Sequence, residues 1–132
     1  MTGDLILVVE DDVKSRKLVH DVLEHEGYRI AEVADGAAGV RMARDLAPAL
    51  IVMDIQLPVL DGIAALHRIR EDPTTHAIPV LAVTASAMPH DRIKIGSAGF
   101  DGYQRKPIDL REFLETVRTL LETRPSRTTT EP

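Results

Sequence analysis

Side chains that can do chemistry follow four short predicted strands of the sequence. Two of these strands, 5–9 and 50–53, are continuous runs of Val, Ile, Leu and Met, typical of strands buried on both faces. The other two are 79–83 and the shorter 101–104. The reactive side chains at or just after the ends of these strands are Glu10, Asp11, Asp12, Asp54, Thr84 and Lys106.

These side chains are expected to converge, because the carboxyl ends of parallel strands lie at one edge of a sheet, where open α/β folds bind ligands. Three carboxylates placed together repel one another and raise the pKa of at least one of them unless a cation is present. Mg²⁺ prefers oxygen ligands and, together with Lys106, would balance two acids and Asp54. The pattern therefore predicts a magnesium site.

A balanced site of this kind assists phosphoryl transfer through positioning and charge neutralisation. Asp54 would be the nucleophile, and the Thr84 hydroxyl and Lys106 ammonium would bind phosphoryl oxygens. The alternative for Asp54 is that it merely ends a strand, since Asp is a common breaker of secondary structure. The reactive residues at the other strand ends favour the site.

Helices are predicted between the strands. The first carries Leu18, Val19, Val22 and Leu23 on one face and ends at Gly27; the second spans 37–46. A further strand, 28–33, lies between them. The third helix follows Asp61, a plausible cap, and the fourth spans 89–98. The last, from Leu110 to Leu121, is strongly amphipathic. Five strands alternating with five helices predict one α/β domain, a parallel sheet with helices on both faces.

The composition excludes several classes of protein. A chain of 132 residues with 44% hydrophobic content suits a single core, and no cysteine is present for a disulfide, a thiol nucleophile or a Cys-based zinc site. No apolar run approaches membrane-spanning length and no signal peptide opens the chain, so we expect a cytoplasmic protein. The net charge of -5 argues against direct nucleic-acid binding. The five scattered histidines are expected at the surface.

Four motifs carry a resemblance to a known family. Val-Val-Glu-Asp, Met-Asp-Ile-Gln-Leu-Pro-Val-Leu-Asp-Gly, Val-Thr-Ala and Gly-Tyr-Gln-Arg-Lys-Pro occur in this order. Together they resemble the receiver domains of two-component response regulators (CheY-like), most of all single-domain regulators of the DivK type. The resemblance covers about residues 4–122 and implies a three-layer flavodoxin-like (βα)5 fold of strand order 2-1-3-4-5. The remaining tail, 123–132, is expected to be disordered.

The resemblance also implies roles for single residues. Asp54 would accept phosphate; Asp11 would bind Mg²⁺ directly, with Glu10 assisting through water. The backbone carbonyl of Gln56 would complete the protein ligands of Mg²⁺, with Mn²⁺ as an alternative ion. Thr84 and Lys106 would bind the phosphoryl group, Tyr103 would act with Thr84 as a switch, and Lys106-Pro107 would be a cis peptide. Plain core packing is the alternative for Tyr103, and Glu10 stands where the family more often has Asp.

The implied partners are a histidine kinase or a histidine phosphotransfer protein as donor. A downstream protein would bind the face of the fourth helix, fifth strand and last helix. The chain would catalyse only its own phosphorylation and dephosphorylation. It is read as a stand-alone response regulator, with a receiver domain from a hybrid kinase or larger regulator as the alternative. A phosphatase of the haloacid dehalogenase type would need a second Asp where Gln56 stands.

Overall fold

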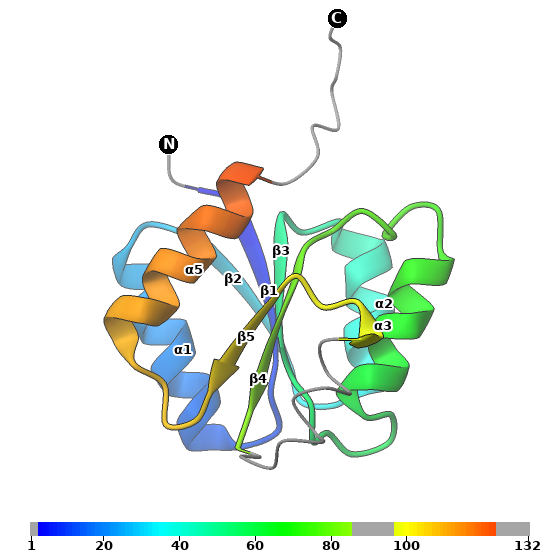
Figure 1. The fold of residues 1–132 in the computed structure, drawn as a ribbon, viewed down its shortest axis with the longest axis horizontal. Helices are drawn as coiled ribbons and strands as arrows, with labels where there is room; N and C mark the ends of the chain where they lie inside the picture. The colour runs from blue at the N-terminus through cyan, green and yellow to red at the C-terminus, as the bar shows by residue number, and fades with distance from the viewer. Residues whose placement is uncertain (1–2, 86–96, 124–132) are drawn as a thin grey trace, which may run out of the picture.

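Apolar runs of the sequence form a parallel sheet in this computed structural model, which describes residues 3–85 and 97–123. The strand order is β2-β1-β3-β4-β5 (Figure 1), which confirms the order implied by the resemblance. β3 and β4 lie inside the sheet and are buried along their whole length, as their unbroken apolar runs predict. The strands are β1 (Leu5–Val9), β2 (Arg29–Val33), β3 (Leu50–Asp54), β4 (Val80–Thr84) and β5 (Gly102–Arg105).

Aspartate caps fix where three of the helices begin. The carboxylates of Asp12, Asp35 and Asp61 each accept the backbone N–H of the residue three positions later, at 2.8, 2.7 and 2.9 Å. The predicted capping role of Asp61 is therefore confirmed. Each helix starts directly after its cap, and the helices described are α1 (Val13–His25), α2 (Gly36–Leu46), α3 (Gly62–Glu71) and α5 (Leu110–Thr123).

The predicted and observed elements differ by a residue or two at their ends. β5 spans 102–105 instead of 101–104, since Asp101 stands just outside the strand and uses its carboxylate to accept the Val80 N–H. α2 begins at Gly36 because Asp35 is its cap. Most of the predicted fourth helix, 89–98, lies outside the described residues. Its last two residues, 97–98, are described and are helical. Residues 124–132 of the predicted tail also lie outside them.

Helices cover both faces of the sheet (Figure 1), and alternate residues of the inner strands face opposite sides and build two cores. Ile6, Val8 and their counterparts pack under α1 and α5, whereas Leu7 and Val9 face α2 and α3. Burial of each such aliphatic side chain contributes roughly 1.5–3 kcal/mol to the free energy of folding. Among the helices described, none is both long and apolar enough to cross a membrane.

Candidate functional site

The carboxyl ends of four strands bring the predicted reactive residues to one edge of the sheet. Glu10 directly follows β1, Asp54 is the last residue of β3, Thr84 is the last of β4, and Lys106 directly follows β5. The parallel register places these ends beside one another, with Asp54 opposite Val83 and Thr84 opposite Arg105. The sheet topology therefore assembles the site from segments far apart in the sequence.

Lys106 forms ion pairs with two of the acids. Its Nζ lies 2.9 Å from Glu10 Oε1 and 3.1 Å from Asp54 Oδ2. The side chains of Glu10 and Asp54 are only 5% and 6% exposed, and that of Lys106 is 20% exposed. Contacts to charged groups at these distances are the stronger kind of hydrogen bond, and low exposure reduces their screening by water.

Backbone groups orient the two buried carboxylates. Asp54 Oδ1 accepts the Gln56 N–H at 3.1 Å, and Glu10 Oε2 accepts the Asp12 N–H at 3.1 Å. The Arg16 guanidinium donates from Nη1 to the Glu10 backbone carbonyl at 2.9 Å. The motifs did not indicate this role of Arg16, whose one sequence signal is its position in the first turn of α1.

The pKa values of Glu10 and Lys106 reflect burial and the ion pairs of Lys106. Burial raises the pKa of the Glu10 carboxyl above its ordinary value, against the lowering effect of the Lys106 ammonium. For Lys106, burial favours the neutral amine, but the pairs with Glu10 and Asp54 outweigh burial and raise the pKa of the ammonium. Lys106 is therefore positively charged at neutral pH.

The acids form a cluster that suits a divalent cation. Carboxylate oxygens of Glu10, Asp11 and Asp54 all lie within 4.8 Å of one another. With Lys106 these groups carry a net charge of about -2 when all are ionised, which a divalent ion neutralises. An all-oxygen donor set with an exposed member, Asp11, fits Mg²⁺, because this ion keeps several of its waters.

Asp12 serves a different purpose from its two neighbours. Its carboxylate accepts the Ser15 N–H at 2.8 Å as the cap of α1, and this backbone hydrogen bond lowers the pKa of Asp12. Asp12 is not part of the cluster formed by Glu10, Asp11 and Asp54. The structure thus separates the acid pair that the resemblance assigned to the metal from the acid that caps the helix.

A close backbone approach holds the loop after Asp54. A Cβ added to Gly62 would lie 2.5 Å from the Asp54 carbonyl oxygen and 2.8 Å from Ile55 Cα, so only glycine fits. The Gly62 N–H donates to the Ile55 carbonyl at 2.8 Å. Within this loop Val59 has a φ of 70° and is 82% exposed. Gly62 therefore allows α3 to start close to the backbone of Asp54.

Thr84 lies on β4, the strand next to β3, and Tyr103 lies on β5, the strand beyond it. Thr84 is 1% exposed, and its carbonyl accepts the Lys106 N–H at 2.8 Å. Tyr103 is partly buried and stands opposite Ala82, two residues before Thr84 on β4. The Lys106-Pro107 peptide is cis, as expected from the resemblance.

A second group of titratable side chains lies on α1, at His20, Asp21 and Glu24. His20 also contacts Glu32 of β2, with its Nδ1 3.0 Å from Glu32 Oε2. Asp21 and Glu24 are exposed, and Lys17 pairs with Asp21 at 2.9 Å. Ion pairs of this kind between exposed side chains contribute little, typically about 0–1 kcal/mol. The group is consistent with the prediction that His20 lies at the surface.

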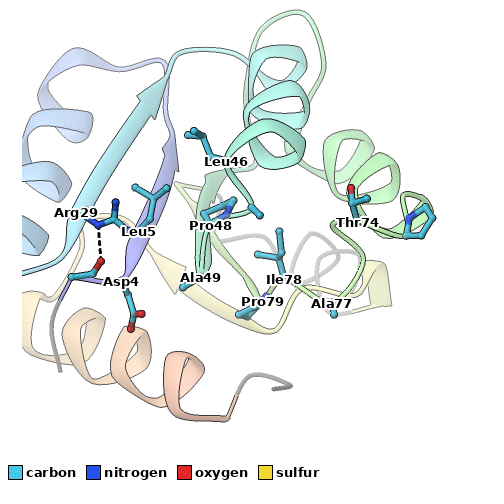
Figure 2. A pocket seen from close by; sticks show the side chains of 13 residues that line it. Asp4, Leu5, Arg29, Leu46, Pro48, Ala49, Thr74, Ala77, Ile78 and Pro79 are labelled. Atoms are coloured by element: carbon cyan, nitrogen blue, oxygen red, sulfur yellow. Dashed lines mark hydrogen bonds between the residues drawn. The ribbon is translucent and has the colours of Figure 1, made fainter. Parts of the chain in front are cut away.

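A large cavity lies at the opposite edge of the sheet from the acids. Its volume is about 350 Å³, and it is lined by residues at the amino ends of the strands, among them Leu5, Ala49 and Pro79 (Figure 2). Asp4 and Arg29 are its charged side chains, and Arg29 donates from Nε to the Gly3 carbonyl at 2.7 Å. None of the reactive residues at the carboxyl ends of the strands lines this cavity, so it is not the candidate site.

Known proteins are similar to this chain in sequence and in fold. The family model for the response regulator receiver domain matches residues 6–118. The polar-differentiation response regulator DivK of Brucella anthropi is 37% identical over 116 residues, which are 88% of this chain and 94% of the relative.

Two solved structures are similar throughout. One is the receiver domain of a sensor histidine kinase from Pseudomonas aeruginosa PAO1, with a magnesium ion coordinated in its active site cleft. It is 35% identical with a TM-score of 0.86, over 92% of this chain and 99% of that one. The other is the receiver domain of a histidine kinase from Syntrophus aciditrophicus, 28% identical with a TM-score of 0.87 over 98% of each chain. Sequence and fold agree, and the chain belongs to the response regulator receiver domains of two-component systems.

Proposed function

We propose that Asp54 accepts a phosphoryl group from a histidine kinase or a histidine phosphotransfer protein in a Mg²⁺-dependent reaction. The observation that carries this proposal is the Asp54 carboxylate at the sheet edge, 3.1 Å from the Lys106 ammonium and within the acidic cluster. A carboxylate nucleophile, a fixed cation and a divalent-ion site are the parts that phosphoryl transfer requires. The chain would catalyse its own phosphorylation and dephosphorylation and no other reaction.

Glu10, Asp11 and Asp54 would hold the Mg²⁺, together with the backbone carbonyl of Gln56. The ion supplies positive charge to the transferring phosphoryl group and a point for orienting it. Mn²⁺ has the same charge and accepts the same oxygen ligands. Gln56 lies two residues after Asp54. The Gln56 N–H donates to Asp54 Oδ1, and this hydrogen bond keeps the Gln56 backbone close to the site.

Three side chains of the protein would act in the phosphoryl transfer. A carboxylate oxygen of Asp54 attacks phosphorus and forms an O–P bond, while the P–N bond to the donor imidazole breaks and its electron pair stays on that nitrogen. Lys106 and the Thr84 hydroxyl bind the equatorial oxygens, where negative charge is spread. Lys106 is already held beside Asp54, so it does not need to be recruited during the reaction.

Uptake of a phosphoryl group tests this function directly. Incubation with phosphoramidate and Mg²⁺ should raise the intact mass by one phosphoryl group, and addition of EDTA should prevent the increase. The same measurement with candidate kinases and ATP identifies the donor. An unchanged mass after incubation with phosphoramidate and Mg²⁺ at neutral pH contradicts the proposal.

We also propose that phosphorylation changes the face formed by the fourth helix, β5 and α5, and that a downstream protein binds there. Thr84 and Tyr103 would connect that face to the site, since Thr84 ends β4, which pairs with the strand of Asp54, and Tyr103 lies on β5, which pairs with β4. A step of Thr84 toward the phosphate would make room for the Tyr103 ring. A partner that prefers this arrangement shifts the equilibrium and by linkage favours phosphorylation.

Beryllofluoride with Mg²⁺ is expected to change amide chemical shifts at Thr84 and through residues 97–110. The reason is that these residues include Tyr103 and Lys106, the side chains proposed to respond to the phosphoryl group. Resonances of α1 and α2 serve as the reference. Shift changes confined to α1 and α2, with 97–110 unmoved, argue against this readout face.

A stand-alone cytoplasmic regulator and a receiver domain of a larger kinase are both compatible with this function. The DivK relative favours the first, and the two receiver domains of histidine kinases favour the second. An immunoblot of the source cells separates them: a band at the mass of 132 residues supports the regulator, and a much larger band supports the kinase.

A further inference from the structure

β5 is the edge strand that leads to Lys106, and it is four residues long. Among the described strands it is hydrogen-bonded to β4 alone. At its carboxyl end the Lys106 N–H donates to the Thr84 carbonyl, and the Lys106 side chain reaches Glu10 and Asp54. The position of this ammonium therefore depends on how firmly the short edge strand is fixed along β4.

At its amino end the strand is anchored by Asp101. The Asp101 N–H donates to the Val80 carbonyl at 2.9 Å, and Asp101 Oδ2 accepts the Val80 N–H at 2.8 Å. One residue thus pairs with both backbone groups of Val80, the first residue of β4. This pairing fixes the register of β5 before the strand begins.

Arg70, in the last turn of α3, binds the same carboxylate. Its Nη2 donates to Asp101 Oδ2 at 2.7 Å and to the Gly99 carbonyl at 3.2 Å. Its Nη1 donates to the carbonyls of His76 and Ile78, at 3.0 and 2.6 Å. In Figure 1 the yellow segment that leads into β5 lies beside α3, where these contacts form. A planar guanidinium can serve four acceptors at once, which an ammonium cannot.

The pair Arg70–Asp101 differs from an ordinary surface ion pair. The Arg70 side chain is 26% exposed and joins α3, the loop before β4 and the segment before β5. By comparison, Arg44 is 58% exposed, and its side chain pairs with Asp72 through Nε at 2.9 Å. The carboxylates differ in the opposite direction, since Asp101 is 41% and Asp72 is 20% exposed, so the contrast between the pairs is in the additional backbone carbonyls that Arg70 binds. Arg44–Asp72 thus provides a matched control.

We propose that Arg70 and Asp101 are positioning residues for Lys106. Asp101 and Lys106 are joined by five residue steps, about 16 Å of extended chain, so the strand transmits a displacement of one end to the other. The contacts of Lys106 at 2.9 and 3.1 Å tolerate a shift of only about 1 Å before they lengthen beyond ion-pair distance. This inference rests on the proposed role of Lys106 in binding the phosphoryl group.

The first test needs no ligand. Amide hydrogen exchange is measured in the full chain for wild type, Arg70→Gln and the control Arg44→Gln. The Lys106 amide should exchange about tenfold faster in Arg70→Gln, because the edge strand opens more often. The Ile51 amide, which donates to the Pro79 carbonyl inside the sheet, should stay within about twofold of wild type. Arg44→Gln should change neither amide.

The second test compares two ligands in the same proteins. Mg²⁺ alone should bind Arg70→Gln with nearly wild-type affinity, because Glu10, Asp11 and Asp54 are untouched. Beryllofluoride in Mg²⁺, which also requires Lys106, should bind about fivefold or more weakly. Arg70→Lys keeps the charge without the fork and should give an intermediate loss. If Arg70→Gln does not fold, Arg70→Lys and Asp101→Asn carry both measurements.

The outcomes separate the two ideas. Equal acceleration of the Lys106 and Ile51 amides, or unchanged exchange at Lys106, overturns the positioning role and assigns the pair to general stability. Failure of wild type to bind beryllofluoride in Mg²⁺ counts against the proposed function, while the exchange measurement still decides whether the pair positions Lys106. In Arg70→Gln, a loss of Mg²⁺ affinity equal to the loss of beryllofluoride affinity also overturns the positioning role.

Discussion

Replacing Asp54 by Asn is expected to abolish phosphoryl uptake from phosphoramidate in Mg²⁺. A carboxamide is a far weaker nucleophile than a carboxylate, and it removes one of the three negative charges of the cluster. The shape of the side chain is kept, and its oxygen can still accept the Gln56 N–H. Intact-mass spectrometry should show one added phosphoryl group on wild type and none on the variant.

Asp61→Asn is the matched control for this loss. Asp61 lies seven residues after Asp54 and caps α3 by accepting the Ala64 N–H. Asn is as good a cap as Asp, so the helix should be retained and uptake should remain at the wild-type level. Labelling of Asp54→Asn at another residue, found by peptide mapping, would show that Asp54 is not the unique acceptor.

The site could be predicted from the sequence because parallel strands obey a simple geometric rule. Asp54 and Lys106 are 52 residues apart, yet both stand at the carboxyl ends of strands, and all such ends share one edge. The chemistry of carboxylates, a hydroxyl and an ammonium then limits what the edge can do. The order of the strands was harder, since apolar runs do not say which strands are neighbours, and it came from the resemblance.

Contacts between side chains and backbone carbonyls could not be predicted. Arg70 reads as one of several charged residues on α3, and only the path of the loop at 72–78 brings two carbonyls to its guanidinium. Arg16 likewise binds the Glu10 carbonyl because the chain turns sharply between β1 and α1. Such contacts depend on the conformation of loops, for which periodicity carries no signal.

The pKa of the Glu10 carboxyl is raised for a reason that the sequence indicated only in part, since the neighbouring Asp54 carboxylate is a smaller cause. The largest cause is burial, which was not evident from the sequence because Glu10 follows the last apolar residue of β1. Its folded pKa lies above the unfolded value, so ionised Glu10 opposes folding as the pH rises above about 4.5. A divalent ion that neutralises the cluster should offset this cost.

Mg²⁺ affinity is expected to fall much more in Asp11→Asn than in Asp12→Asn. Asp11 belongs to the cluster with Glu10 and Asp54, and its exposed carboxylate is the one that can reach an ion with its own waters. Loss of a direct charged ligand should weaken binding by at least about tenfold. The carboxylate of Asp12 instead accepts the Ser15 N–H.

Asp12→Asn removes the same charge one residue away and preserves the cap, since Asn and Asp are equivalent there. Its Mg²⁺ affinity should change by less than about threefold, because what it loses is a screened interaction at longer range. Calorimetric titration measures both affinities. The shift of the unfolding midpoint with Mg²⁺ concentration provides a second measure through linkage. A larger loss in Asp12→Asn than in Asp11→Asn would place the metal-binding acid pair one residue later, at Asp11 and Asp12.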